Sequence, residues 1–145
     1  MLRIEYKTIP MVTKDFVDNL SYEIFASIIE VHKNLGPGLI ESIYHKCLAH
    51  ELKLRNINFT SEASFEFNYK DLNLTTDFRC DLFVENFIML ELKAVQEVIP
   101  YFKTKLISQM KIAKAPKGIL VNFNVKNIMS EGKFVFLNEH YSQLS

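Results

Sequence analysis

The sequence contains no tryptophan, only two cysteines, and only four glycines and four prolines among its 145 residues. Two cysteines, Cys47 and Cys80, cannot form a disulfide framework, and this favours a reducing, cytoplasmic setting. Neither a Pro/Gly-rich linker nor a low-complexity tract interrupts the chain. We therefore expect one domain over residues 1–145, with loose ends at residues 1–10 and 138–145.

Long apolar runs and an excess charge of either sign are also lacking. No stretch approaches the roughly 20 apolar residues of a membrane helix, and the first ten residues do not resemble a signal peptide. Seventeen Lys and Arg balance seventeen Asp and Glu, whereas a dedicated DNA-binding module is usually strongly basic. We expect no membrane partner, and contact with nucleic acid must come from a local basic patch.

Hydrophobic residues make up 48% of the chain, and their spacing changes along it. Apolar steps of three and four predict helices over residues 13–35 and 39–54, separated by a Gly-Pro-Gly turn. The pattern then alternates at period two. This alternation predicts strands over residues 65–69, 74–84 and 87–93.

The remaining elements complete a mixed fold. Pro100 suits the first turn of a third helix, which runs to about Ala113. The short apolar run at residues 119–123 is typical of a buried parallel strand, and residues 134–136 predict a final edge strand. The order predicts an α/β fold of the α+β mixed-sheet type. Two N-terminal helices precede an antiparallel three-strand meander, and a right-handed helical crossover then leads to a parallel strand.

Two acids and a lysine stand inside these apolar strands. Buried charges are costly unless they are paired or bind a metal. Glu91 and Lys93 share one face of their strand because side chains alternate. Carboxylates and a backbone carbonyl, here Asp81, Glu91 and the carbonyl of Leu92, are the hard oxygen ligands that Mg²⁺ or Mn²⁺ prefers. A solvated face of an amphipathic strand is the alternative, and spacing alone leaves both interpretations open.

A further acid lies on the second helix. Gly38, Glu41 and Tyr44 follow at three-residue steps, so they share one helix face. Glu41 is either part of the same site or an ordinary first-turn acid that interacts favourably with the helix dipole.

These segments resemble the GxxExxY family of the PD-(D/E)XK nuclease superfamily over roughly residues 20–137. The matching blocks are GLIESIY (38–44), RCDL (79–82), ELKAV (91–95) and GILVNF (118–123). The resemblance implies a restriction-endonuclease-like core, a Mg²⁺ or Mn²⁺ cofactor and a nucleic-acid substrate. It makes Glu41 the helical acid, Asp81 the central metal ligand, Glu91 the second ligand and Lys93 the catalytic lysine.

One departure from the family concerns the helix after the E-x-K strand. Relatives often carry Gln and Tyr where this chain has Lys105 and Gln109, which we expect to bind substrate together with Tyr44. Lysine binds phosphate as a point charge, but the usual Gln–Tyr hydrogen bonding is missing. A metal-dependent phosphodiesterase acting on DNA or RNA is therefore one hypothesis. A catalytically weak or inactive nuclease-fold protein that binds nucleic acid or a protein partner is the alternative.

Other features have ordinary explanations beside functional ones. His45, Cys47 and His50 suggest zinc only weakly, because the two histidines point in different directions on a helix. Cys80 suits buried packing better than nucleophilic chemistry. An edge strand near Phe134 allows a structural homo-oligomer. Five lysines form a basic segment that is either a solvated face or a phosphate contact: 103, 105, 111, 114 and 117.

The register of the hairpin between Asp81 and Glu91 decides whether the site can form. A two-residue loop pairs Val84 with Phe87 and sends the two acids to opposite faces. A three-residue loop over residues 85–87 pairs Val84 with Ile88 and keeps the acids together. A bulge near Asp81 would have the same effect. We expect the three-residue loop, with Asn86 or its neighbour in the left-handed conformation.

Overall fold

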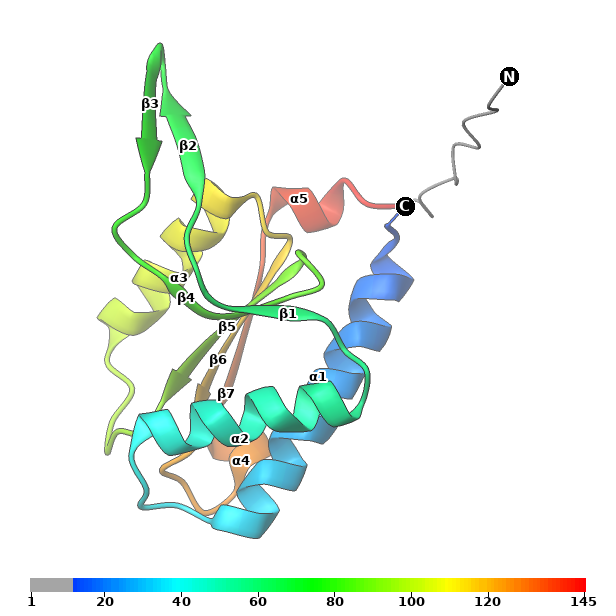
Figure 1. The fold of residues 1–145 in the computed structure, drawn as a ribbon, viewed down its shortest axis with the longest axis vertical. Helices are drawn as coiled ribbons and strands as arrows, with labels where there is room; N and C mark the ends of the chain where they lie inside the picture. The colour runs from blue at the N-terminus through cyan, green and yellow to red at the C-terminus, as the bar shows by residue number, and fades with distance from the viewer. Residues whose placement is uncertain (1–11) are drawn as a thin grey trace.

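A computed structural model describes residues 12–145 (Figure 1). The helices are α1 (Lys14–Leu35), α2 (Glu41–Leu54), α3 (Pro100–Ala113), α4 (Ile128–Glu131) and α5 (Glu139–Ser142). The strands are β1 (Phe59–Ala63), β2 (Glu66–Tyr69), β3 (Leu72–Thr75), β4 (Cys80–Val84), β5 (Ile88–Lys93), β6 (Lys117–Asn122) and β7 (Lys133–Leu137). None of the described helices is long and apolar enough to cross a membrane.

The turn between α1 and α2 determines where α2 begins. Helix α1 starts after Thr13, whose hydroxyl accepts the Phe16 N–H, and ends before Gly36, whose φ of 68° favours glycine. The Tyr44 hydroxyl donates to the Gly36 carbonyl and accepts the Leu39 N–H at 3.2 Å. Tyr44 thus holds the turn closed, and α2 begins at Glu41 rather than at residue 39.

A five-stranded sheet in the order β1-β4-β5-β6-β7 forms the centre of the fold. Strands β5 and β6 are parallel and joined through α3, whereas the other neighbours are antiparallel. One core cluster packs α1 and α2 against the sheet, and a second packs α3 against its other face. The predicted α/β fold with a mixed sheet is therefore confirmed.

The meander differs in detail from the prediction. Residues 65–69 do not join the main sheet, because β2 pairs only with β3 in a separate hairpin that stands away from the body (Figure 1). Thr76 closes the base of this hairpin: its N–H donates to the Phe65 carbonyl and its hydroxyl accepts the Phe65 N–H. The alternating pattern continues from β3 into β4 and so concealed this break. The strand that pairs with β4 is β1, which the sequence analysis missed.

The C-terminal residues are ordered, so the prediction of a loose end at residues 138–145 is wrong. Asn138 caps α5 by accepting the His140 N–H. The Tyr141 hydroxyl donates to Asp18 on α1, and the Lys14 N–H donates to the Ser145 carbonyl at 3.0 Å. The other predicted loose end, residues 1–10, lies outside the described residues.

Candidate metal centre

The β4–β5 hairpin has the register that brings Asp81 and Glu91 together. Val84 pairs with Ile88, and the pairing continues to Leu82 and Leu90. The loop is three residues long, and Glu85 and Asn86 both adopt left-handed conformations, with φ of 51° and 60°. The predicted three-residue loop is therefore confirmed.

Strand β4 parts from β5 at Asp81. The paired residues end at Leu82 and Leu90, and beyond them the Asp81 Oδ2 accepts the Leu92 N–H at 2.8 Å. The carboxylate of Asp81 therefore replaces a backbone partner in the sheet. The alternation of side chains also breaks here, since Cys80 packs with the α3 cluster while Leu82 packs with the α1–α2 cluster. Asp81 thus lies in the gap between two central strands.

Glu91 lies beside this gap in a small cavity on the α3 face of the sheet. Lys93, Lys105 and Gln109 line the same cavity. Within residues 12–145, the Oε1 atom of Glu91 is buried and has no hydrogen-bond partner, and the same holds for Oε1 of Gln109. Burial raises the pKa of Glu91, and the negative charge of Asp81 raises it further. A buried carboxylate is costly unless it is paired, protonated or bound to a cation.

Lys93 and the end of β5 are held by contacts on both sides. The Lys93 Nζ lies 4.3 Å from the centre of the Phe102 ring, a cation–π distance. Beyond β5, the buried Asn122 side chain accepts the Val95 N–H and donates to the Val95 carbonyl. Asn122 therefore fixes the loop that leaves Lys93. The sequence analysis did not assign it this role, because a partner so distant in sequence has no local signal.

Glu41 approaches the same region from the first turn of α2. Desolvation raises its pKa, the charge of Asp81 raises it further, and Lys93 and His45 lower it. The pKa of Glu41 thus responds to the charges of both Asp81 and Lys93. The assignment of Glu41 to the same site as Asp81 and Lys93 stays a prediction.

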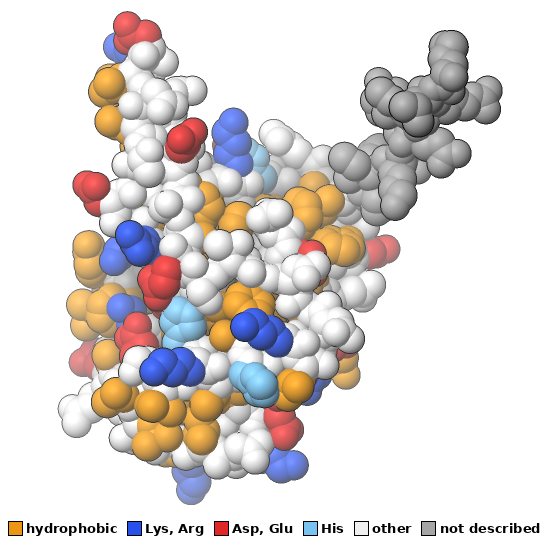
Figure 2. All heavy atoms as spheres, viewed as in Figure 1, with side chains coloured by type: hydrophobic (Ala, Val, Ile, Leu, Met, Phe, Trp, Pro, Cys, Tyr) orange, Lys and Arg blue, Asp and Glu red, His pale blue; other side chains and the backbone are white. Residues whose placement is uncertain are grey.

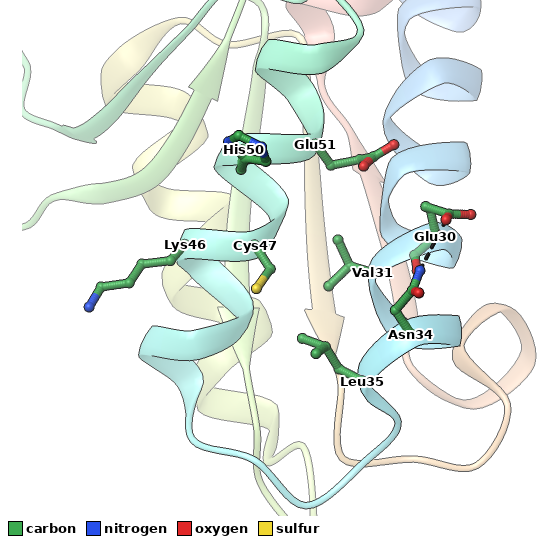
Figure 3. Close-up of a pocket in the computed structure, with 8 residues that line it drawn as sticks. All are labelled: Glu30, Val31, Asn34, Leu35, Lys46, Cys47, His50 and Glu51. Atoms are coloured by element: carbon green, nitrogen blue, oxygen red, sulfur yellow. Dashed lines mark hydrogen bonds between the residues drawn. The ribbon is translucent and has the colours of Figure 1, made fainter.

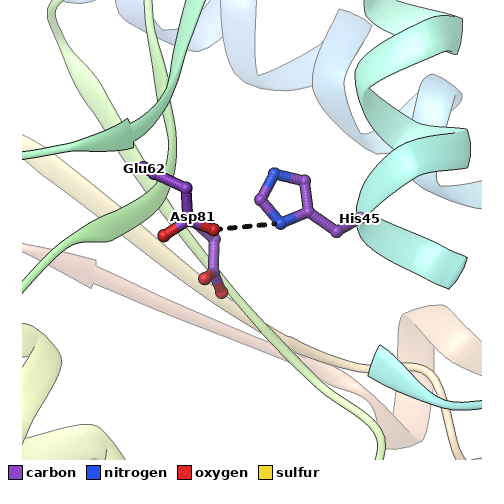
Figure 4. Close-up of side chains that lie close together, drawn as sticks. All are labelled: His45, Glu62 and Asp81. Carbon is purple, nitrogen blue, oxygen red and sulfur yellow. Dashed lines mark ion pairs between the residues drawn. The ribbon is translucent and has the colours of Figure 1, made fainter. Parts of the chain in front are cut away.

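The tightest set of cation-binding atoms is a different one. His45, Glu62 and Asp81 each offer an atom, and the three atoms all lie within 4.8 Å of one another (Figure 4). In the part of the chain that the structure describes, Glu41, Asp81 and Glu91 do not form such a set of three. Sequence reasoning missed Glu62 entirely. His45 was considered only for zinc, together with Cys47 and His50. Its position one turn after Glu41 could have connected it with the strand acid.

Two residues predicted to contact substrate or phosphate are buried instead. Tyr44 is fully buried and stacks on Phe123 with ring centres 4.5 Å apart, and its hydroxyl serves the α1–α2 turn. Lys117 is only 8% exposed, and burial lowers its pKa. Burial leaves Tyr44 little access to substrate, and it removes Lys117 from both interpretations of the lysine segment, a solvated face and a phosphate contact.

The three residues that suggested zinc do not come together. Cys47 and His50 line a groove between α1 and α2 (Figure 3), whereas His45 turns toward Glu62. His45, Cys47 and His50 therefore do not form one group of zinc ligands. Cys80 is buried, its thiol donates to the Leu82 carbonyl, and burial raises its pKa well above the usual range. It therefore packs the core, as expected.

The surface around the cavity is mixed in character. Lys105 and Gln109 line both the cavity of Glu91 and a neighbouring shallow groove with Phe78 and Tyr101. The Lys103 Nζ lies 4.1 Å from the centre of the Phe134 ring. Figure 2 shows acidic, basic and histidine side chains interspersed on the face that carries α2 and β1. This face therefore does not form one broad basic surface, because acidic side chains lie between the basic ones.

The fold is a mixed sheet covered by helices on both faces, with acids and a lysine near the point where two central strands part. A family model described as the PD-(D/E)XK nuclease superfamily matches residues 18–133, and the chain belongs to that superfamily. Nucleases of this superfamily generally depend on a divalent metal. Comparisons with curated proteins and with solved structures find no match.

Proposed function

We propose that the protein is a divalent-metal-dependent nuclease that hydrolyses phosphodiester bonds in DNA or RNA. The observation that carries the proposal is the buried Oε1 atom of Glu91, which has no hydrogen-bond partner among the described residues and lies in a cavity with Lys93, in a nuclease superfamily domain. Within the superfamily, we further propose membership of the GxxExxY family, which the resemblance of the block GLIESIY at residues 38–44 and of the three later blocks supports.

The donor set fits Mg²⁺ or Mn²⁺. Asp81, Glu91 and the backbone carbonyl of Leu92 supply hard oxygen atoms at the gap between β4 and β5, and Glu41 adds a carboxylate from α2. The unpaired Glu91 Oε1 supports this fit, because a cation would satisfy it. A bound cation would act as a Lewis acid toward the phosphate and make a coordinated water more acidic.

The side chains of the protein position the reactants. Lys93 lies beside Glu91 in the cavity, where its ammonium group can orient the attacking water and offset charge that develops on the phosphate. The ring of Phe102 limits the movement of that ammonium group. Lys105 lines the same cavity and gives a second positive charge for a phosphate oxygen. Gln109 is buried and lines this cavity too, and its Oε1 has no hydrogen-bond partner among the described residues.

The alternative is a weak or inactive nuclease-fold protein that binds nucleic acid or a protein partner. Gln109 supports it, since this residue stands where relatives often carry Tyr and is only 4% exposed. Binding without cleavage would identify this alternative.

Cleavage of mixed DNA and RNA in the presence of Mn²⁺ or Mg²⁺ tests the proposal. We expect the wild-type protein to cut, Asp81→Asn to lose at least about a hundredfold in rate, and a chelator to abolish cutting. His50→Ala is the matched control, because His50 lines the α1–α2 groove instead of the site. Cutting that survives both Asp81→Asn and the chelator would show a contaminating nuclease and overturn the proposal.

A further inference from the structure

The main sheet has two outer edges, and only one of them is regular. At the first edge, the pairing of β1 with β4 skips Glu62, whose φ of 51° is left-handed. At the other edge, all residues of β7 pair with β6 in one unbroken register, and none of them has a positive φ. An interrupted edge resists pairing with another strand, whereas a regular edge favours it.

Three residues of β7 direct their backbone hydrogen-bonding groups away from the sheet. The Asn122 N–H donates to the Gly132 carbonyl at 2.8 Å. In an antiparallel ladder both groups of a residue point to the same side, and this side alternates along the strand. Gly132 and every second residue after it therefore face β6, and the N–H and C=O groups of Lys133, Val135 and Leu137 point outward. None of the backbone hydrogen bonds of the described loops and turns reaches these three residues.

The side chains of these three residues leave the edge open to another strand. Val135 is 41% exposed and Leu137 is 51% exposed. A lysine on an edge strand usually discourages pairing, and Lys133 is the one charged residue of β7. Its Nζ, however, lies 4.8 Å from the centre of the Phe25 ring on α1. The charge is thus held against the helix rather than along the edge.

We propose that two copies of the chain associate by antiparallel pairing of β7 with β7, so that their two main sheets become one. A twofold axis at Val135 places this residue opposite itself and places Lys133 opposite Leu137 of the second copy. This register pairs all three outward-facing residues at once, and each pair exchanges two backbone hydrogen bonds. On the other face of the sheet it places Phe134 opposite Phe136 of the second copy, and cross-strand aromatic pairs are stabilising.

Charge does not oppose this association. The two copies of Lys133 are four residues apart along the new ladder, which is about 14 Å and exceeds the Debye length of about 8 Å at physiological salt. The seventeen basic and seventeen acidic residues of each chain give no net repulsion between copies.

The pairing also determines how the two candidate sites lie. Opposed residues of an antiparallel pair share a face, so the α3 faces of both copies lie on the same side of the joint sheet. The two cavities of Glu91 therefore lie on that side as well. Only this consequence involves the proposed function, because the association itself requires neither metal nor substrate.

Sedimentation velocity in the absence of metal and nucleic acid tests the inference. We expect the wild-type mass to double as the concentration rises. Val135→Lys and Val135→Glu each place two like charges opposite each other, with Cα atoms about 5.5 Å apart, so each variant alone should associate at least tenfold more weakly. An equimolar mixture of the two variants should restore the dimer. Leu72→Lys is the matched control, because Leu72 is an exposed apolar residue of the separate hairpin, and it should associate as the wild type does.

Several outcomes would overturn the inference. One is a wild type that stays monomeric up to about 1 mM, the weak end of specific association. Another is a dimer that survives both Val135→Lys and Val135→Glu, since it would use a different surface. A mixture that fails to restore the dimer, while circular dichroism shows both variants folded, would exclude the axis at Val135. Protection of the Val135 amide from hydrogen exchange in a monomer would show that residues 1–11 of the same chain occupy the edge instead of a second copy.

Discussion

Asp81 has two tasks that substitution can separate. Its Oδ2 accepts the Leu92 N–H, so Asp81→Ala leaves a strand N–H unpaired at a cost of about 1–3 kcal/mol. Asp81→Asn keeps a carbonyl oxygen as acceptor and should cost less than about 1 kcal/mol, although it loses the charge that a cation needs. Urea denaturation and Mn²⁺ titration of both variants measure the two effects. Equal destabilisation by both substitutions would show that the hydrogen bond does not support the sheet.

Glu91 makes the metal-free protein sensitive to pH. Its pKa rises from 4.5 to about 8 on folding, first because of burial and then because of the charge of Asp81. Between pH 4.5 and about pH 8, Glu91 keeps its proton in the folded protein and has lost it in the unfolded chain. Its stabilising contribution is therefore complete below pH 4.5 and is lost as the pH rises through 8.

Glu91→Gln removes this pH dependence. One unit of pKa shift corresponds to about 1.4 kcal/mol. From pH 5 to pH 8, the free energy of unfolding of the variant should therefore rise by at least about 1 kcal/mol relative to that of the wild type. Denaturation in chelator at both pH values measures the difference. Glu97→Gln, an exposed site in the loop after β5, is the control and should leave the pH dependence unchanged. If the free energy of unfolding of Glu91→Gln changed with pH as much as that of the wild type, Glu91 would not be the source of the pH dependence.

At the scale of elements, the β2–β3 hairpin should open independently of the main sheet. Its strands pair only with each other, and all of their residues are half-buried or exposed. A lone two-stranded ribbon is marginally stable in water. Amide hydrogen exchange should therefore be fast at β2 and β3 and slowest in β5 and β6, whose buried residues form the centre of the core. Protection of the hairpin equal to that of β5 would indicate that it packs on something else.

The elements that the sequence predicted best carry their own local signals. Thr13 and Gly36 bracket α1, Pro100 opens α3, and the apolar run before Asn122 forms β6. The predictions failed where a distant contact decides the outcome. Strand β1 has little apolar pattern of its own and exists because it pairs with β4.

In the candidate site, too, the sequence indicated residues with a local signal and missed those that a distant contact brings into place. Charged residues inside apolar segments drew attention to Asp81, Glu91 and Lys93, but only the resemblance to a family favoured a shared site with Glu41, and that assignment stays a prediction. Glu62 could not be found, because only its pairing opposite Asp81 and its left-handed backbone bring it to the site. Tyr44 was misplaced because a motif position says nothing about burial, and this tyrosine is used to close a turn.

For the whole molecule, the even balance of charge predicts weak, salt-sensitive binding to nucleic acid with little sequence preference. Seventeen basic and seventeen acidic residues give no net attraction, so Lys105 and its neighbours on α3 must supply the phosphate contacts. Fluorescence anisotropy with unrelated oligonucleotides over a range of salt measures both properties. Lys105→Ala should weaken binding to all sequences alike. Tight binding that is unchanged at high salt would contradict this expectation.

The parallel pairing of β5 with β6 also affects when the site can form during synthesis. The antiparallel contacts of β5 end at Leu90, so Glu91, Leu92 and Lys93 pair with a strand only through residues 120–122 of β6. A ribosome adds roughly 5–20 residues per second, so the stretch from residue 93 to residue 122 takes about 1.5–6 s. Until then the half of β5 that carries Glu91 and Lys93 has no neighbouring strand to hold its shape. On the proposed function, a growing chain beside its own messenger RNA therefore carries no organised cleavage site.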